Sequence, residues 1–431
     1  EIASCLVGSE MCIRDRLIGF LGTLNYSYND VYLLDASVRM DGSSEFGADK
    51  RFAPFWSAGT GVNIHNYGFM KGQTVIDQLK IRVSYGQTGK VNFPPYVART
   101  TYKMFTDGWY KTGFGGTLYA LGNTNLTWET TNTWDAGVEL SLWKRLLYIK
   151  ASYYQKKTVD LVNSVTIPSS TGFTTYMDNI GEVENKGYEL EFRSEVVRRK
   201  DLFVAVFANL AHNENRILKI SESLKAYNDR VKDHFANSNR FDGSNTQPFT
   251  QYVEGGSQTS IWGVPSLGID PATGEEIFIR PDGSITNTWN TNDQVVLGDT
   301  EPKIQGTFGL NATYKNLSLY MTFMYEAGGQ IYNSTLRDKV EDVNVYTSNV
   351  DKRVFSERWQ EPGDKARYRK LTSGVGGSIM RTRPTSRFVE DNNVLTLNSI
   401  SLGYDFDAGQ KWMKTIGLSM LRFEIGANDV C

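Results

Sequence analysis

The chain has 431 residues, a formal net charge of -2 and an isoelectric point near 6.1, so it lacks the basic excess that nucleic-acid binding requires. No stretch approaches the ~20 consecutive apolar residues of a membrane-spanning helix. Its mean hydropathy of -0.39 still permits a transmembrane β-barrel, because a spanning strand needs only about 10 residues with alternate positions apolar. The 40 glycines, 23 tyrosines and 22 phenylalanines favour strands and turns, with little helix.

The first segment, residues 1–16, shows no strand alternation and holds Cys5 and Cys12. We expect it to be a non-native or assembly scar, and it lacks the basic start and apolar run of a signal peptide. The third cysteine is Cys431, so no disulfide or thiolate metal site is possible between residues 13 and 430. Residues 17–431 are expected to form one partial β-barrel domain.

Period-two alternation dominates the rest of the chain. Leu79, Ile81 and Val83, for example, alternate with polar residues, as a strand with one apolar side requires. Such runs predict roughly twelve antiparallel strands in six hairpins. In chain order these are 18–28/31–40, 55–64/78–87, 131–142/147–155, 187–196/202–211, 305–314/317–326 and 394–406/417–427.

Short and long connections alternate between these strands. Links within a hairpin are mostly short and polar or basic, as at Lys144-Arg145, with longer exceptions at 65–77 and 407–416. Links between hairpins reach 88–130, 156–186, 212–304 and 327–393. Tight turns on one rim and long loops on the other are typical of a transmembrane barrel, whereas a soluble sandwich has no reason to alternate.

Aromatic residues gather at the predicted strand ends and suggest two interfacial girdles. The alternative is that aromatics are simply good strand residues. The residues are Trp143, Tyr148, Tyr314 and Trp412 near the short turns, and Tyr85, Trp134, Tyr153, Tyr154, Tyr188 and Tyr325 toward the long loops.

Motifs for catalysis or metal binding are missing from the sequence. His65, His212 and His234 are far apart and lack metal-ligand spacing, and no phosphate-binding or serine-hydrolase motif occurs. Asp405 and Asp407 lack the full calcium-loop pattern, so a turn is the better interpretation. We therefore expect no enzyme activity, no metal and no cofactor.

Aromatic residues in two long connections are the candidate ligand-binding residues, because rings can stack on sugar faces or grip a peptide. They are Tyr102, Trp109, Tyr110, Phe114 and Trp289. The alternative, which we favour, is that these rings form the small internal cores that long ordered loops need.

An ordered series of segments resembles the barrel of SusC/RagA family TonB-linked outer-membrane proteins, and it covers nearly the whole chain after residue 17. The segments are Asp41-Gly-Ser-Ser-Glu-Phe-Gly, Arg51-Phe-Ala-Pro-Phe-Trp-Ser-Ala-Gly, Leu79-Lys-Ile-Arg-Val-Ser-Tyr-Gly-Gln-Thr-Gly, Asn125-Leu-Thr-Trp-Glu, Tyr153-Tyr-Gln-Lys-Lys-Thr-Val-Asp-Leu-Val, Gly181-Glu-Val-Glu-Asn-Lys-Gly-Tyr-Glu-Leu, Gly268-Ile-Asp-Pro-Ala-Thr-Gly, Leu297-Gly-Asp-Thr-Glu-Pro-Lys-Ile-Gln-Gly, Arg387-Phe-Val-Glu-Asp and Ser401-Leu-Gly-Tyr.

This resemblance implies an all-β, antiparallel transmembrane barrel of about 22 strands with a plugged lumen, of which this chain supplies roughly half. The plug and the TonB-contacting segment of the family would precede residue 17, and further strands would follow residue 431. The implied function is TonB-driven import of an oligosaccharide or peptide across the bacterial outer membrane, with a SusD-like surface lipoprotein as partner. The rival interpretations are a passive or structural barrel, such as a porin or adhesin, and a soluble β-rich binding protein.

Overall fold

The computed structural model describes residues 17–43, 51–90, 100–110, 113–120, 122–123, 126–166, 175–179, 181–237, 246–345, 349–371, 380–406, 413 and 415–430. The chain divides into two compact units. The first comprises Glu1–Phe192 and Asn215–Tyr227, and the second Arg193–Glu214 and Asn228–Cys431. Each unit is described by itself below.

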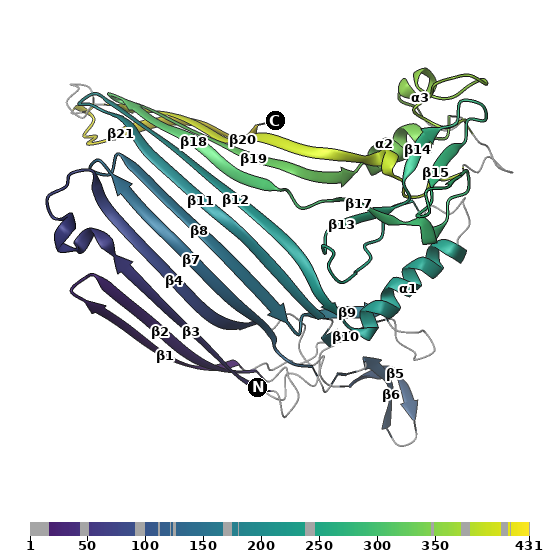
Figure 1. Ribbon diagram of the computed structural model, residues 1–431, viewed down its shortest axis with the longest axis horizontal. Helices are drawn as coiled ribbons and strands as arrows, with labels where there is room; N and C mark the ends of the chain where they lie inside the picture. The colour runs from purple at the N-terminus through teal and green to yellow at the C-terminus, as the bar shows by residue number, and fades with distance from the viewer. Residues whose placement is uncertain are drawn as a thin grey trace. The chain divides into compact units, whose positions relative to one another are not determined.

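Long antiparallel strands in chain order form the main sheet of each unit (Figure 1). The first unit contains β1 (Leu17–Tyr28), β2 (Tyr32–Ser43), β3 (Phe52–Asn63), β4 (Ile76–Lys90), β7 (Glu129–Leu142), β8 (Leu147–Val159) and most of β11 (Gly181–Arg198). The second contains most of β12 (Leu202–Ile220), then β18 (Ile304–Tyr314), β19 (Leu317–Tyr332), β20 (Val389–Phe406) and β21 (Leu421–Val430). These are the members of a 12-stranded sheet, which confirms the six predicted hairpins.

Several strands are longer than predicted, and the extra length lies mainly at the long-loop ends. β12 continues to Ile220, β19 continues to Tyr332 and β20 begins at Val389. At about 3.3 Å per residue, the 19 residues of β12 extend roughly 60 Å, about twice the span of a membrane strand. Alternation had predicted only the part with one apolar side, because beyond it both faces carry polar residues.

The two faces of the sheet differ in the way the alternation predicts. The register aligns apolar side chains on one face, which we call the apolar face, and polar ones on the other, the polar face. Across β1, β2 and β3, Leu24 lies opposite Ala36 and Ala36 opposite Ala58. Large side chains of the apolar face are exposed rather than buried, including Phe20, Leu24, Val38, Trp56, Val138, Leu190, Phe308, Leu402 and Ile425.

The short connections are tight because their residues adopt left-handed backbone conformations. Trp143, Lys144 and Arg145 have φ of 53°, 57° and 66° between β7 and β8, and Lys315 has φ 52° between β18 and β19. Asp77 accepts a hydrogen bond from the Arg145 backbone N–H at 2.9 Å, which ties this turn to the start of β4.

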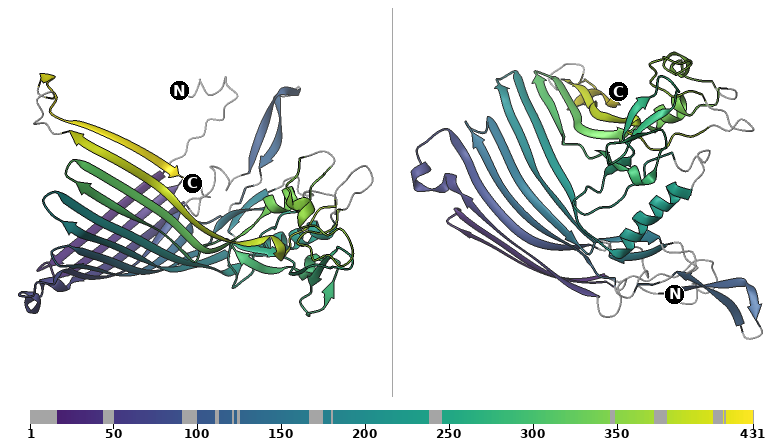
Figure 2. Two further views of the ribbon diagram at one scale, coloured as in Figure 1. Left: turned by 90° about the horizontal axis from the view of Figure 1, so that it is seen from above. Right: turned by 45° about the vertical axis from the view of Figure 1, so that its right-hand side comes forward.

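The long connections hold elements that the sequence did not predict. They are the hairpins β5 (Thr101–Tyr110)/β6 (Gly113–Ala120) and β9 (Val162–Thr166)/β10 (Thr175–Asn179), the helix α1 (Glu222–Asn237), and the short strands β13 (Ser260–Gly263), β14 (Ser266–Ile269), β15 (Glu276–Ile279), β16 (Ile285–Thr286) and β17 (Val295–Asp299). Figure 2 shows β5 and β6 as a separate two-stranded hairpin. In the described part of the chain, no helix has the length and apolarity to cross a membrane.

Buried apolar clusters lie at the long-loop side of the sheet. In the first unit Phe55, Leu126, Trp128 and Val162 pack together, and the Phe55 and Trp128 rings meet at 5.7 Å. In the second unit a larger cluster comprises Leu336, Val340, Val343, Val354, Tyr368 and Phe388. The hydrophobic cores of these units therefore stabilise the loops.

Candidate functional site: polar face and loop module

The polar face of the first unit carries charge in columns that alternate in sign from strand to strand. β4 contributes Lys80 and Arg82, β7 Asp135 and Glu139, β8 Lys150 and Lys156, and β11 Glu189 and Glu191. Arg82 Nη1 lies 3.3 Å from Asp135 Oδ1, and Lys80 and Lys150 flank Glu139 in the register. Pairing between neighbouring strands lets a charged face remain locally neutral.

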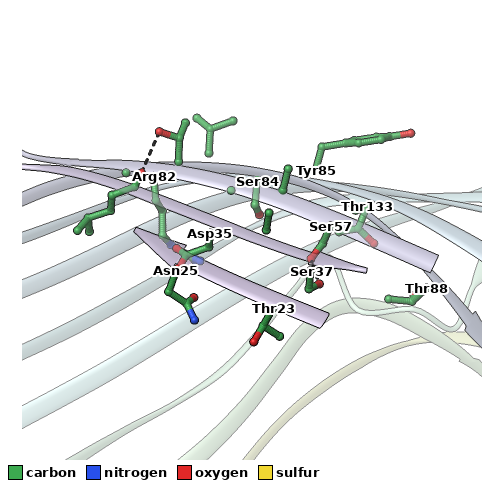
Figure 3. A pocket seen from close by; sticks show the side chains of 18 of the residues that line it. Thr23, Asn25, Asp35, Ser37, Ser57, Arg82, Ser84, Tyr85, Thr88 and Thr133 are labelled. Carbon is green, nitrogen blue, oxygen red and sulfur yellow. Dashed lines mark hydrogen bonds between the residues drawn. The ribbon is translucent and has the colours of Figure 1, made fainter. Parts of the chain in front are cut away.

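A hollow of about 600 Å³ lies along β1, β2, β3 and β4. Its polar lining combines the charged side chains of Asp35, Lys80 and Arg82 with small hydroxyl side chains, among which those of Ser37 and Ser57 hydrogen-bond at 2.7 Å. Gly59 and Gly61 have no side chains, so the surface is recessed between the neighbouring side chains. Figure 3 shows Thr23, Ser37 and Ser57 on one side of the strands and Tyr85 on the other. Such a surface can hydrogen-bond a neighbour or a solute.

The long connections of the second unit pack around buried ion pairs. We call residues 246–303, 333–345, 349–371 and 380–388, which lie between the long strands, the loop module. Glu341, whose side chain is fully buried, lies 2.8 Å from Arg387 and 3.3 Å from Arg369. Arg387 also binds Glu276 at 2.8 Å, and Arg369 binds Asp342 at 2.9 Å. These contacts connect β15 and residues 337–342 with Arg369 and Arg387, so the network holds remote parts of the loops in one arrangement.

The pKa values of Glu341 and Asp342, two neighbouring carboxylates of this network, are shifted in opposite directions. Burial raises the pKa of Glu341, but the charges of Arg387 and Arg369 outweigh it and leave the pKa below its ordinary value. Burial raises the pKa of Asp342 above its ordinary value, although Arg369 opposes the shift. Arg358 donates to the carbonyls of Val354, Val340, Glu341 and Arg369, which satisfies backbone groups in the same interior. The network is a structural scaffold.

The predicted ligand-binding aromatics of the first long connection belong to the β5/β6 hairpin. Tyr102 is 67 % exposed. The backbone register places Trp109 opposite Phe114 and Tyr110 opposite Gly113, while the side chains of Trp109, Tyr110 and Phe114 lie outside the described part of the structure. The hairpin thus brings four of the five predicted residues onto one element.

Trp289 lies elsewhere, in the loop module. Its side chain is buried, its indole N–H donates to the Pro384 carbonyl at 3.0 Å, and its ring packs 5.3 Å from that of Phe235. The Arg383 guanidinium lies over the same ring at 4.8 Å. This is the placement expected if the ring forms part of a loop core.

A row of exposed aromatics crosses the apolar face near the long loops, one on each of five neighbouring strands. The members are Trp56, Tyr85, Trp134, Tyr153 and Tyr188. Sequence reasoning missed Trp56, although its alternation with Pro54 and Ala58 could have found it. Two predicted girdle members were wrong: the register puts Tyr148 opposite Ser141 and Tyr154 opposite Asp135, both on the polar face. Trp412 lies outside the described residues.

The vertical spacing of the aromatic residues matches a membrane. From Trp134 to the end of β7 at Leu142 is eight residues, about 26 Å along the strand, which a tilt of about 40° reduces to roughly 20 Å, and Trp143 follows in the turn just beyond. Apolar bands of outer-membrane barrels are about 25 Å tall.

Near the turns, Tyr28 stacks on Tyr32 and the Tyr67 hydroxyl donates to that of Tyr32 at 2.9 Å.

The histidines contact backbone or other rings. His65 Nδ1 lies 3.2 Å from both backbone N and O of Leu79, His212 Nδ1 lies 2.6 Å from the Lys303 carbonyl, and the His234 ring packs on Phe249. Across the described ranges, no group of three or more His, Cys, Asp or Glu residues could hold a metal ion. Asp407 lies outside the described residues.

Comparison with known proteins gives consistent matches. The family model described as TonB dependent receptor-like, beta-barrel matches residues 13–333. TonB-dependent receptor P26 of Formosa agariphila is 31% identical over 406 residues, which cover 92% of this chain and 40% of the relative. TonB-dependent receptor SusC of Bacteroides thetaiotaomicron is 27% identical over 409 residues, covering 91% of this chain and 38% of the relative.

Among solved structures, the RagAB peptide transporter superposes with a TM-score of 0.81 at 22% sequence identity. The match covers 97% of this chain and 44% of that one. This chain therefore spans about two-fifths of the length of the proteins it matches, and the structural match confirms the fold.

Proposed function

Because this chain belongs to the TonB-dependent receptor-like β-barrel family, we propose that it forms part of the wall and the external loops of an importer in the bacterial outer membrane. The observation that carries the proposal is the exposed apolar face with its aromatic row, opposite a polar face of paired charges. Lipid can cover the first face and water the second, whereas a soluble protein would bury one of them.

The proposed cargo is a nutrient oligosaccharide or peptide. It would be held from outside with a SusD-like surface lipoprotein and admitted when the TonB complex acts on segments outside this chain. The resemblance to the SusC/RagA group supports both partners. The relatives are receptors and transporters and not enzymes, in agreement with the expectation from the sequence.

Binding would come from the polar face and the loops, where exposed rings such as Tyr102 offer contact area without charge. Tyr102, together with Trp109, Tyr110 and Phe114, remains a proposed cargo contact, to be tested with Tyr102→Ala in the assay below. Trp289 would act indirectly, by holding the loop module together.

The test is energy-dependent uptake by cells that express the intact parent protein. Cells of the source organism, or a host carrying the parent gene and its neighbours, are given radiolabelled oligosaccharide or peptide mixtures. We expect uptake to require the parent gene and to fall to background when a protonophore collapses the inner-membrane gradient or when tonB is deleted.

Uptake that survives both treatments would instead establish the passive barrel. Recovery of the parent protein in the soluble fraction without detergent would overturn the membrane location altogether. A variant lacking residues 100–120 separates the loops from the wall, because it removes the β5/β6 hairpin and leaves the long strands intact.

A further inference from the structure

Two aromatic side chains stack on the polar face of the second unit, where the predicted girdles have no role for them. The Phe207 and Tyr320 rings have centroids 6.1 Å apart and planes 18° apart. They come from β12 and β19, on either side of β18. Tyr320 is 40% exposed. We call this pair the aromatic platform.

Gly309 of β18 makes the stacking possible. The register places Phe207 directly opposite Gly309, and Asn311 opposite Tyr320. A Cβ at Gly309 would lie within 2.4 Å of Phe207 Cζ, so any side chain there would push the ring away. The absent side chain lets the Phe207 ring lie across β18 toward Tyr320, and the two rings form one surface.

Neutral hydrogen-bonding groups lie beside the aromatic platform on β18 and β19, and charge begins at Ser318, whose hydroxyl accepts a hydrogen bond from Arg422 Nη2 at 3.2 Å. Across β18 the polar-face positions are Gln305, Thr307, Gly309, Asn311 and Thr313, and Ser318 and Thr322 lie on β19. Within the described residues, Thr322 is buried and its hydroxyl has no hydrogen-bond partner. This neutral stretch contrasts with the charged columns of β4, β7, β8 and β11.

We propose that the aromatic platform is a stacking subsite for a neutral saccharide on its way through the importer. The flat C–H face of a sugar ring packs on an aromatic face, while hydroxyls around its rim hydrogen-bond to amides and hydroxyls such as those of Asn311 and Ser318. β18 itself carries no charged side chain, so a charged group on the cargo would find no partner of opposite sign on that strand. The inference rests on the proposed function, because the polar face meets solute only if the apolar face lies against lipid.

The experiment uses the intact parent protein in nanodiscs, with native cysteines replaced by serine and Asn311→Cys as the reporter. A charged, water-soluble thiosulfonate modifies this cysteine. Protectants are a mixed hydrolysate of starch, cellulose and mannan, or a tryptic digest of albumin. We expect the saccharides to slow modification and the peptides not to. Phe207→Leu with Tyr320→Leu should raise the half-protecting saccharide concentration about fivefold, the scale of one aromatic contact.

The same strands provide a matched control. Phe308 and Phe323 stack at 5.1 Å on the apolar face of β18 and β19, so Phe308→Leu with Phe323→Leu should leave protection unchanged. Three results would overturn the subsite: no protection by saccharides, protection by peptides alone, or an Asn311→Cys that never reacts because another segment of the parent covers it.

A second cysteine reporter distinguishes a failure of the proposed subsite from a failure of the proposed membrane function. Leu310→Cys lies on the apolar face, one residue from Asn311. It should resist the water-soluble reagent and react with a lipid-soluble maleimide. Rapid reaction of Leu310→Cys in water would contradict the membrane orientation itself, whatever Asn311→Cys does.

Discussion

Glu341 is a carboxylate shared by two guanidinium groups in the interior of the loop module. Glu341→Gln keeps its volume and removes its charge, which leaves Arg369 and Arg387 with less compensation in a buried site. Breaking such a buried pair costs about 3–5 kcal/mol. We expect hydrogen exchange of residues 336–345 in the intact parent to accelerate by the corresponding factor. The exposed Glu361→Gln is the control in the same module and should exchange like the unmodified protein.

The pH dependence follows from the sign of the pKa shift. The pKa of Glu341 is lower in the folded chain than its ordinary value of 4.5, so its stabilising contribution is complete above about that pH. It is lost as the pH falls through the lower, folded value. The pKa of Asp342 is raised instead, so protonation of Asp342 at falling pH stabilises the folded chain. Protection factors of the module, which are corrected for the intrinsic pH dependence of exchange, should therefore fall only in strong acid, and Glu341→Gln should abolish that acid limb. An acid limb unchanged in the variant would show that another group is responsible.

At the scale of elements, β18 presents one face to lipid and the other to water. Leu310→Arg places a charge on the apolar face near the middle of the strand, where it should cost about 2–4 kcal/mol. Asn311→Arg, one residue later, places the same charge on the polar face and should cost little. Folding of the parent into lipid vesicles, followed by urea titration, measures both. Equal destabilisation by the two variants would be inconsistent with a membrane strand.

Alternation was sufficient to predict the long strands, because each strand repeats a period-two pattern against a uniform environment on each side. Val138 and Ala136 lie on one face whatever the rest of the chain does. The pattern could not extend to the long-loop ends, because polar stretches such as 212–216 contain no alternation of apolar and polar residues, and their strand conformation depends on pairing with a neighbour.

Inside the long connections, local sequence patterns predicted the structure less well than they did in the long strands. The helix α1 buries Leu224, Val231 and Phe235, a spacing of seven and four residues that the sequence does contain. The network of the loop module was invisible, because Glu276, Glu341 and Arg387 are remote in sequence and read individually as solvated charges. The aromatic platform was missed for the same reason, since Phe207 and Tyr320 meet only through the register of three strands.

For the whole molecule, the intact parent should expose its apolar face to the hydrocarbon of the bilayer. A photoactivatable reagent dissolved in the lipid phase should label Leu79, Ile81, Val83, Val138 and Leu140, and mass spectrometry of the peptides would locate the adducts. Lys80, Arg82 and Glu139, their neighbours on the polar face, should stay unlabelled. Labelling of both sets alike, or of neither, would contradict the assignment of the two faces.

The alternating charge columns of β4, β7, β8 and β11 affect what a permeating molecule senses. Neighbouring strands are about 4.8 Å apart, less than the Debye length of about 8 Å at physiological salt, so each positive column is cancelled within one step by a negative one. A molecule more than a few ångströms from this surface meets almost no field. Cations, anions and uncharged compounds would therefore diffuse past this surface in the same way. The surface could discriminate between them only once they come into van der Waals contact with it.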